Sequence, residues 1–218
     1  MTEHEQIADS PGPMLKVGGV VLCGGKSSRM GEPKDWLPFG NERMLQRAVR
    51  ILGQIVNPIV VAAAVGQDLP ELPDDVIVVR DEESEQGPLQ GIMVGLTAIA
   101  PYAEAAYVTS CDVPLLSVAF VKYVISRLGQ HQIAIPRDEK YHHPLAAVYR
   151  CEVAAAAQRL IRSDRLRPIF LLKECSFIEI PVAELRAVDP DLHSLMNLNY
   201  PDEYAVALKT AGFGSQTL

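Results

Sequence analysis

The sequence predicts an α/β fold built on a mostly parallel sheet, and two features of the chain support this expectation. Short apolar runs rich in β-branched residues alternate with longer segments in which apolar residues recur at helical spacing. This alternation is typical of a sheet whose strands are joined by helices. After residue 130, two strand-like runs follow each other closely, so we expect an antiparallel strand in the C-terminal half.

The predicted strands are short runs bounded by Pro, Gly or Asp. The apolar run at 17–22 is too short for a helix and indicates a buried strand. The run at 177–182 alternates apolar and polar residues, which indicates a half-buried strand. The other expected strands lie at residues 58–64, 76–80, 105–110, 132–136 and 144–150.

The predicted helices carry apolar residues three or four positions apart. In the segment 44–52, Leu45, Val49 and Leu52 fall on one face. The last helix begins at Pro201 and is followed by a glycine, which is the common arrangement at the two ends of a helix. Further helices are expected at residues 89–100, despite the glycines there, and at 117–128 and 152–161.

Composition narrows the possible classes of protein. With 218 residues, 48% of them apolar, the chain can bury a substantial core, and its net charge of −7 argues against a nucleic-acid or membrane-surface partner. No run approaches the ~20 apolar residues of a membrane span. Four scattered cysteines without a CxxC pair predict thiols in a reducing cytoplasm. We expect residues 1–14 to be a flexible leader, 15–211 a single domain and 212–218 a tail.

A loop rich in glycine and cations follows the first predicted strand. Gly24 and Gly25 come directly after the apolar run, and Lys26, Arg29 and Lys34 follow them. Ligands of open α/β sheets bind at the carboxyl ends of the strands, and glycine lets backbone N–H groups approach an anion. The loop therefore predicts a phosphate site, although neither G-x-x-x-x-G-K-[ST] nor G-x-G-x-x-G occurs. A tight turn with solvated lysines is the alternative.

The whole string is more specific, because LCGGKSSRMGEPK resembles the L-x-G-G-x-S-x-R-M-G-x-x-K signature of nucleotidyltransferases, above all the molybdenum cofactor guanylyltransferases. The resemblance implies a Rossmann-like three-layer nucleotidyltransferase fold. It also implies that Leu22, Cys23 and the glycine pair wrap a triphosphate, whose charge Arg29 and Lys34 neutralise. Pro33 stands where many members of the family have Asp, and this departure puts the shape of the loop in question.

A second segment, DEESEQGPLQGI, resembles the family's acidic residue followed by G-P-L-x-G. The resemblance implies a loop that contacts the nucleoside, formed by Asp81, Gly87, Pro88, Leu89 and Gly91. Asp81 is also a candidate for a second metal contact. An ordinary turn into a helix N-terminus, where acidic residues are favourable, is the alternative.

A third segment, YVTSCDVPLLS, resembles the family's strand that ends in C/A-D-x-P. A carboxylate at the end of a central strand is suited to hold Mg²⁺, which prefers one or two carboxylates together with phosphate oxygens. The resemblance thus makes Asp112 the metal ligand and Mg²⁺ the cofactor. The alternative for Asp112 is the N-cap of the helix that follows Pro114.

Two later segments, HPLAAVYR and NLNYPDEY, resemble the family patterns H-P-x-x-A-L-Y and N-x-N-T-P-E-D/E. The resemblance suggests that His143, Asn197 and Asn199 lie near the acceptor, where amides suit the edge of a pterin ring. As alternatives, the histidine is structural and the two asparagines organise a turn before the last helix.

Taken together, the motifs imply a cytoplasmic, Mg-dependent nucleotidyltransferase domain that transfers GMP from GTP to molybdopterin and releases pyrophosphate. Arg29, Lys34 and Asp112 are its expected catalytic residues. Candidate partners include molybdenum-insertion and molybdoenzyme maturation proteins, but neither nucleic acid nor a membrane. The alternatives are a relative that uses CTP or a sugar or isoprenoid phosphate acceptor, and a non-catalytic nucleotide-binding module.

The choice of base is expected to depend on the first glycine of the pair. In the family resemblance, L-x-G-G goes with guanine and L-x-A-G with cytosine. A methyl group at Gly24 would either push the base outward or require a backbone angle that alanine resists. We therefore expect GTP to be preferred over CTP and ATP.

Overall fold

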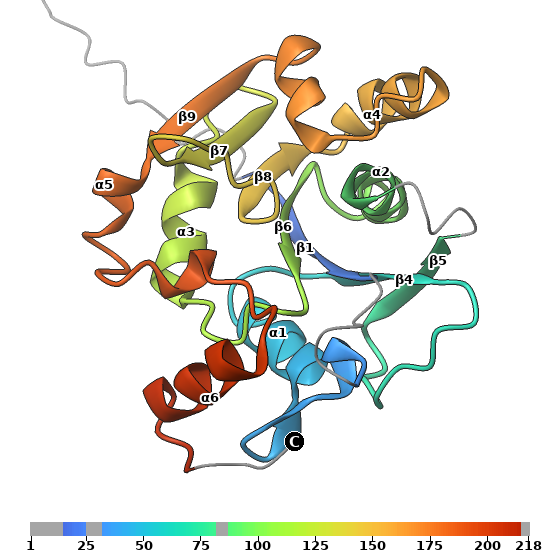
Figure 1. The fold of residues 1–218 in the computed structure, drawn as a ribbon. Helices are drawn as coiled ribbons and strands as arrows, with labels where there is room; N and C mark the ends of the chain where they lie inside the picture. The colour runs from blue at the N-terminus through green and yellow to red at the C-terminus, as the bar shows by residue number, and fades with distance from the viewer. Residues whose placement is uncertain (1–14, 25–31, 82–86, 215–218) are drawn as a thin grey trace, which may run out of the picture.

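The computed structural model describes residues 15–24, 32–81 and 87–214. The expected leader at 1–14 and the expected site residues Gly25 and Arg29 lie outside these ranges. A seven-stranded sheet in the order β5-β4-β1-β6-β8-β7-β9 crosses the molecule (Figure 1). Its strands are β1 (Val17–Cys23), β4 (Ile59–Ala64), β5 (Ile77–Asp81), β6 (Ala105–Ser110), β7 (Ile133–Arg137), β8 (Ala147–Arg150) and β9 (Phe177–Pro181).

The sheet is mostly parallel, as the sequence predicts. The strands β5, β4, β1 and β6 pair in parallel, as do β7 and β9. Strand β8 runs antiparallel to both of its neighbours, β6 and β7. The expected antiparallel strand in the C-terminal half is thereby confirmed. It begins at Ala147 instead of residue 144, because a turn in which Ala146 N donates to His143 O precedes it.

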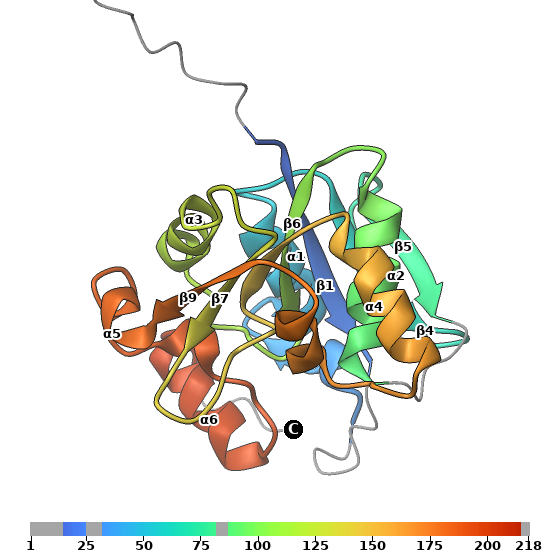
Figure 2. The ribbon, with the colours of Figure 1, turned by 90° about the horizontal axis from the view of Figure 1, so that it is seen from above.

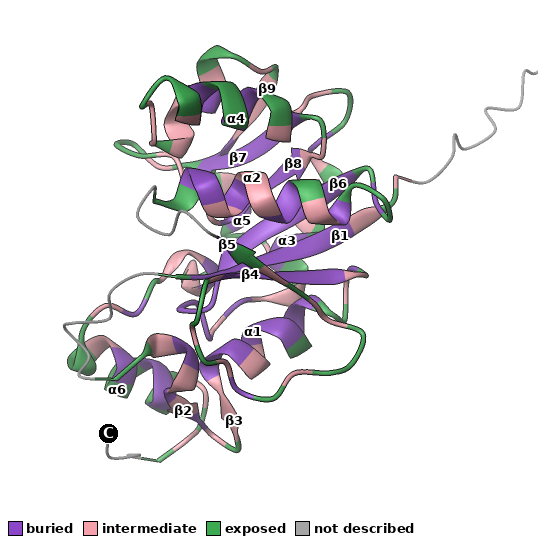
Figure 3. Ribbon diagram, turned by 90° about the vertical axis from the view of Figure 1, so that its right-hand side faces the viewer, coloured by how far each residue is buried: buried purple, intermediate pink, exposed green. Residues whose placement is uncertain are grey.

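Helices cover both faces of the sheet, which gives three layers (Figure 2). One face packs against α1 (Met44–Leu52), α3 (Val118–Ser126) and the short α5 (Val182–Leu185). The other face packs against α2 (Pro88–Ile99) and α4 (Val153–Arg162). The central strands are almost entirely buried between these layers (Figure 3). The predicted three-layer α/β architecture is confirmed.

The glycines of α2 bring this helix close to the central strand β1. A Cβ atom at Gly95 would lie 2.4 Å from Val20 Cγ1, and one at Gly91 would lie 3.0 Å from Leu22 Cδ2. The glycines reduce the helix propensity of the segment, but they permit a contact that a larger residue would prevent. The helix predicted at 89–100 therefore forms despite them.

The helix predicted from Pro201 forms, but the smaller layer that it builds below the sheet was not predicted from the sequence. Helix α6 (Pro201–Thr210) packs on the hairpin of β2 (Pro38–Phe39) and β3 (Glu42–Arg43), and the hydroxyl of Tyr204 donates to Pro38 O. Three short 3₁₀ turns lie at η1 (Lys34–Trp36), η2 (Pro168–Lys173) and η3 (His193–Leu195). None of the helices in the described ranges combines the length and apolar content that crossing a bilayer requires.

Candidate active site

A cavity of about 810 Å³ opens where four parallel strands end. Gly24 follows β1, Gln67 follows β4, Asp81 ends β5 and Asp112 follows β6, and all four residues line the cavity. Parallel neighbours bring their carboxyl ends to the same edge of a sheet, which is where open α/β sheets bind ligands. The volume is in the range of sites for small molecules and cofactors.

Asp112 is the centre of a hydrogen-bonded cluster at one side of this cavity. Lys34 Nζ donates to Asp112 Oδ2 at 2.7 Å and also to Asn199 Oδ1 at 2.9 Å. Ser110 Oγ donates to Asp112 Oδ1 at 2.5 Å, and Asn197 Nδ2 donates to the same oxygen at 3.2 Å. The cluster places a cation and a carboxylate in direct contact and holds both carboxylate oxygens in position.

Backbone hydrogen bonds fix the segment that carries Asp112. Cys111 N donates to Leu22 O at 3.0 Å, which extends the pairing of β6 with β1 beyond the strand. Leu198 N donates to Asp112 O at 2.9 Å, which brings the two asparagines on either side of Leu198 to the carboxylate. Asp112 does not cap α3, since the N-cap of that helix is Ser117. The N-cap alternative for Asp112 is therefore wrong.

The turn that carries Lys34 is tied to the end of β4. The next residue, Asp35, is 3% exposed, and Gln67 Nε2 donates to its Oδ2 at 3.2 Å. Gln67 Oε1 in turn accepts from Ala64 N at 3.1 Å. Burial raises the pKa of the Asp35 carboxyl above its ordinary value. This network fixes the start of the lysine's side chain relative to the cavity.

The N-terminus of α2 forms another wall of the cavity. Gly87 has a φ of +72°, a left-handed conformation that glycine adopts readily, and Pro88 then starts the helix. Both residues line the cavity, whereas the side chain of Leu89 is fully buried in the core beneath it. Gln90 Nε2 donates to Asp81 Oδ1 at 3.1 Å, so this helix also holds the carboxylate that ends β5.

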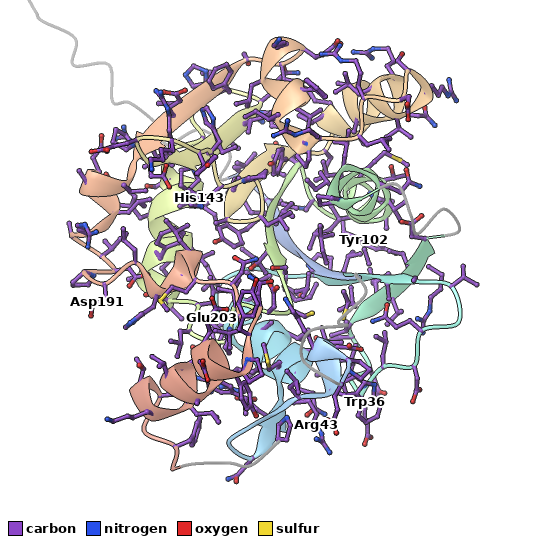
Figure 4. All side chains as sticks on the ribbon, viewed as in Figure 1. Trp36, Arg43, Tyr102, His143, Asp191 and Glu203 are labelled. Carbon is purple, nitrogen blue, oxygen red and sulfur yellow. The ribbon has the colours of Figure 1, made fainter. Side chains whose placement is uncertain are left out.

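The three residues expected near an acceptor lie in two different places. Asn197 lines the cavity and Asn199 bonds Lys34, so both belong to the Asp112 cluster. His143 lies in the connection between β7 and β8, and its Nε2 is 3.1 Å from Asp138 Oδ2. Figure 4 shows His143 apart from Glu203, which lies at the start of α6, close in sequence to the two asparagines. An acceptor role for these residues stays a prediction.

The sequence does not predict several residues of the site, among them Asp35, Ser110, Gln67 and Gln90. Ser110 could have been found, because it lies two positions before Asp112 and alternate strand residues share a face. Gln67 and Gln90 carry no comparable signal, since each becomes part of the site only through contacts with a distant segment.

The protein itself leaves room for a side chain at Gly24. A Cβ atom built there meets no other described atom within 4 Å, and the backbone is not left-handed at this position. The expectation that an alanine at this position would strain the backbone is therefore wrong. Contact between a methyl group and a bound base remains as the physical reason for a glycine.

The oxygen-bearing side chains of the Asp112 cluster fit a divalent ion that arrives with its substrate. Within the described ranges, no three His, Cys, Asp or Glu side chains gather into a group that could hold a metal by itself. Mg²⁺ is commonly bound through one or two carboxylates, with phosphate oxygens and water as its other ligands. Asp112 lines the cavity and supplies such a carboxylate.

Comparisons with known proteins agree with this geometry. A family model described as MobA-like NTP transferase domain matches residues 19–175. A probable molybdenum cofactor guanylyltransferase of Mycobacterium tuberculosis H37Rv is 35% identical over 192 residues, which cover 86% of this chain and 94% of the relative. One of Methanosarcina acetivorans is 28% identical over 206 residues, covering 87% and 88%.

Among solved structures, molybdopterin-guanine dinucleotide biosynthesis protein A of Archaeoglobus fulgidus has the same fold. It superposes with a TM-score of 0.73 at 20% sequence identity and covers 91% of this chain and 99% of its own. This coverage shows that the chain has the Rossmann-like fold of that structure.

Proposed function

We propose that this protein joins GMP from GTP to molybdopterin and releases pyrophosphate. The premise is that the chain belongs to the MobA-like NTP transferase family and is a nucleotidyltransferase. The names of its relatives in Mycobacterium tuberculosis and Methanosarcina acetivorans support the nucleotide and the acceptor. The observation that carries the proposal is the contact between Lys34 and Asp112 beside the cavity.

Nucleotidyl transfer requires positioning and charge neutralisation more than covalent participation of the protein. In the proposed reaction, a phosphate oxygen of molybdopterin forms a bond to the α-phosphorus of GTP, and the bond from that phosphorus to pyrophosphate breaks in line. An ionised phosphate needs no general base. Lys34 neutralises charge at the α-phosphate, and Asp112 holds the divalent ion. Mg²⁺, when bound, supplies further charge neutralisation on the phosphate oxygens.

Asp81 is the proposed contact of the base. Guanine presents N1–H and the N2 amine side by side, so its edge offers two donors to the two oxygens of a carboxylate. Adenine and cytosine have a ring nitrogen acceptor at the corresponding place, which a carboxylate repels. The position of Asp81 in the cavity wall supports this assignment.

The proposal extends to the surroundings in the cell. Cys23, Cys111, Cys151 and Cys175 are free thiols, which supports a reducing cytoplasm. Molybdenum-insertion and molybdoenzyme maturation proteins are the protein's proposed partners.

Thermal shift with GTP, CTP, ATP and UTP in the presence of Mg²⁺ is the first test. A nucleotide at a hundred times its Kd adds about 2.7 kcal/mol to the free energy of unfolding, so the preferred one is directly visible. Pyrophosphate release with GTP and molybdopterin then measures the transfer. A larger shift with CTP, or no release with this pair of substrates, contradicts the proposed nucleotide or acceptor.

A further inference from the structure

Gln90 is a buried polar residue behind the wall of the cavity. Its side chain is 6% exposed, and its Nε2 donates to Asp81 Oδ1 at 3.1 Å. Its Oε1 is also buried and has no hydrogen-bond partner among the described residues. Gln90 is not part of the cavity lining, whereas Asp81 is. Any effect of this amide on a ligand must therefore pass through the carboxylate of Asp81.

Stability alone does not account for an amide at this position. The neighbouring buried residues of α2, namely Leu89, Ile92 and Leu96, are apolar and fully enclosed. A buried carbonyl oxygen without a donor destabilises the folded state, and an apolar residue of similar size would avoid that penalty. Gln90 makes its favourable contact with Asp81, so we expect the amide to contribute to the function of that carboxylate.

We propose that Gln90 is a positioning residue that sets base specificity by holding the carboxylate of Asp81 toward the cavity. This inference rests on the proposed contact of Asp81 with guanine. The terminal torsion of an aspartate is broad, so each donor that contacts the carboxylate narrows the range of its orientations. The amide of Gln90 fixes one oxygen and thereby sets the plane in which both oxygens face a base.

The contribution of the amide is greatest for a base with two adjacent donors. Guanine offers N1–H and N2–H to a carboxylate held in one plane, whereas hypoxanthine offers N1–H alone. A carboxylate that is held less firmly in that plane still accepts one hydrogen bond but makes two less often. Loss of Gln90 therefore reduces the preference for GTP over ITP more than it reduces the binding of ITP.

The test is direct titration of GTP and ITP, each with Mg²⁺, into the full-length protein and its variants. Gln90→Met keeps an unbranched side chain of similar size and removes the donor, and Gln90→Leu serves as a second apolar variant. The native protein should bind GTP about tenfold or more tightly than ITP, the scale of one hydrogen bond to a charged group. In both variants this ratio should fall at least about threefold, while the melting temperature stays equal or rises.

A matched control comes from the same helix. Thr97 is exposed, and among the described residues its hydroxyl bonds only the backbone and side chain of Met93 in the preceding turn. Thr97→Ala should leave the GTP-to-ITP ratio unchanged. If this control changes the ratio as much as Gln90→Met does, the effect is a general one of α2, and the assignment to Gln90 is wrong.

A double-mutant cycle with Asp81→Asn separates the inference from the function on which it rests. Because Gln90 acts through Asp81, Gln90→Met should have no effect on the GTP-to-ITP ratio in the Asp81→Asn background. If the native protein prefers GTP but Gln90→Met leaves the ratio unchanged, the role of Gln90 is refuted and the proposed function stands. If the native protein binds GTP and ITP equally, the proposed contact of Asp81 with guanine and the role of Gln90 are both refuted, whereas the transfer of GMP is judged separately by pyrophosphate release.

Discussion

Replacing Lys34 by Met is predicted to strengthen the binding of a metal ion in the absence of nucleotide while it abolishes transfer. The ammonium lies 2.7 Å from Asp112 Oδ2, and the two side chains are 18% and 13% exposed. A metal that binds this carboxylate must therefore compete with a cation already in contact with it. Methionine keeps the unbranched stem and removes the charge.

The size of the effect follows from this geometry. Two unit charges at this distance attract by about 1.5 kcal/mol in the dielectric of water and by about 6 kcal/mol at an effective dielectric of 20. The side chains are mostly covered but not fully buried, so we take a net value near the lower limit, as for other charge-assisted hydrogen bonds. A difference of about 1.4 kcal/mol is tenfold in Kd. We therefore expect metal affinity to increase about tenfold.

Mn²⁺ binding measured by electron paramagnetic resonance provides the assay, since Mn²⁺ accepts the same oxygen ligands as Mg²⁺. Lys122→Met, at an exposed lysine on α3, is the matched control and should leave the Kd unchanged. Asp112→Asn should abolish binding at this site. The reasoning is refuted if Lys34→Met binds Mn²⁺ no more tightly than the native protein, because the ammonium then does not compete for the carboxylate.

Three further predictions concern the same molecule. Asp112→Asn should reduce transfer by at least ~100-fold, the scale of lost electrostatic stabilisation in a transition state, and near-normal pyrophosphate release would exclude a metal role. Gly24→Ala should leave the melting temperature unchanged, because its Cβ meets no described atom within 4 Å, but should lower kcat/KM for GTP relative to CTP; an unchanged ratio would contradict the argument on base size. A hydrogen bond with the Cys23 thiol, followed by burial, raises the pKa of Cys111, and burial raises the pKa of Tyr107 and Tyr149. The folded state therefore keeps protons that the unfolded chain releases above the ordinary pKa values of 9.0 and 10.0. The free energy of unfolding has its full value below pH 9 and should decrease as the pH rises through 9 and 10. Urea unfolding at pH 10.5 should give a value at least about 1 kcal/mol lower than at pH 8.

The sequence predicts the sheet and its helices well because both have strong local patterns. The run at 17–22 and the helical spacing at 44–52 are visible without any knowledge of tertiary contacts. The hairpin at Pro38–Phe39 and Glu42–Arg43 has strands of only two residues, which are too short for periodicity to indicate.

The position of the site can be predicted from the sequence, but the contacts between its residues cannot. Strand ends in a parallel sheet meet at one edge, so Asp81 and Asp112 could both be assigned to the cavity. The direct contact of Asp112 with Lys34 joins residues 78 positions apart, and the contact of Asn199 with Lys34 spans 165 positions. Sequence patterns report short separations only, so they do not reveal the contacts of the two asparagines with Lys34 and Asp112, and the expected place of the asparagines near an acceptor stays a prediction.

The backbone hydrogen bond from Leu198 to Asp112 also has a consequence for the order in which the chain matures. The family model ends at residue 175, whereas Asn197 and Asn199 come from the segment that precedes α6. A nascent chain that has emerged only as far as residue 190 already contains all seven strands of the sheet, but not the amides that hold the lysine and the carboxylate. Synthesis of the last segment is thus the event that completes the Asp112 cluster, and a chain released before that point would contain every strand of the sheet but lack the finished site.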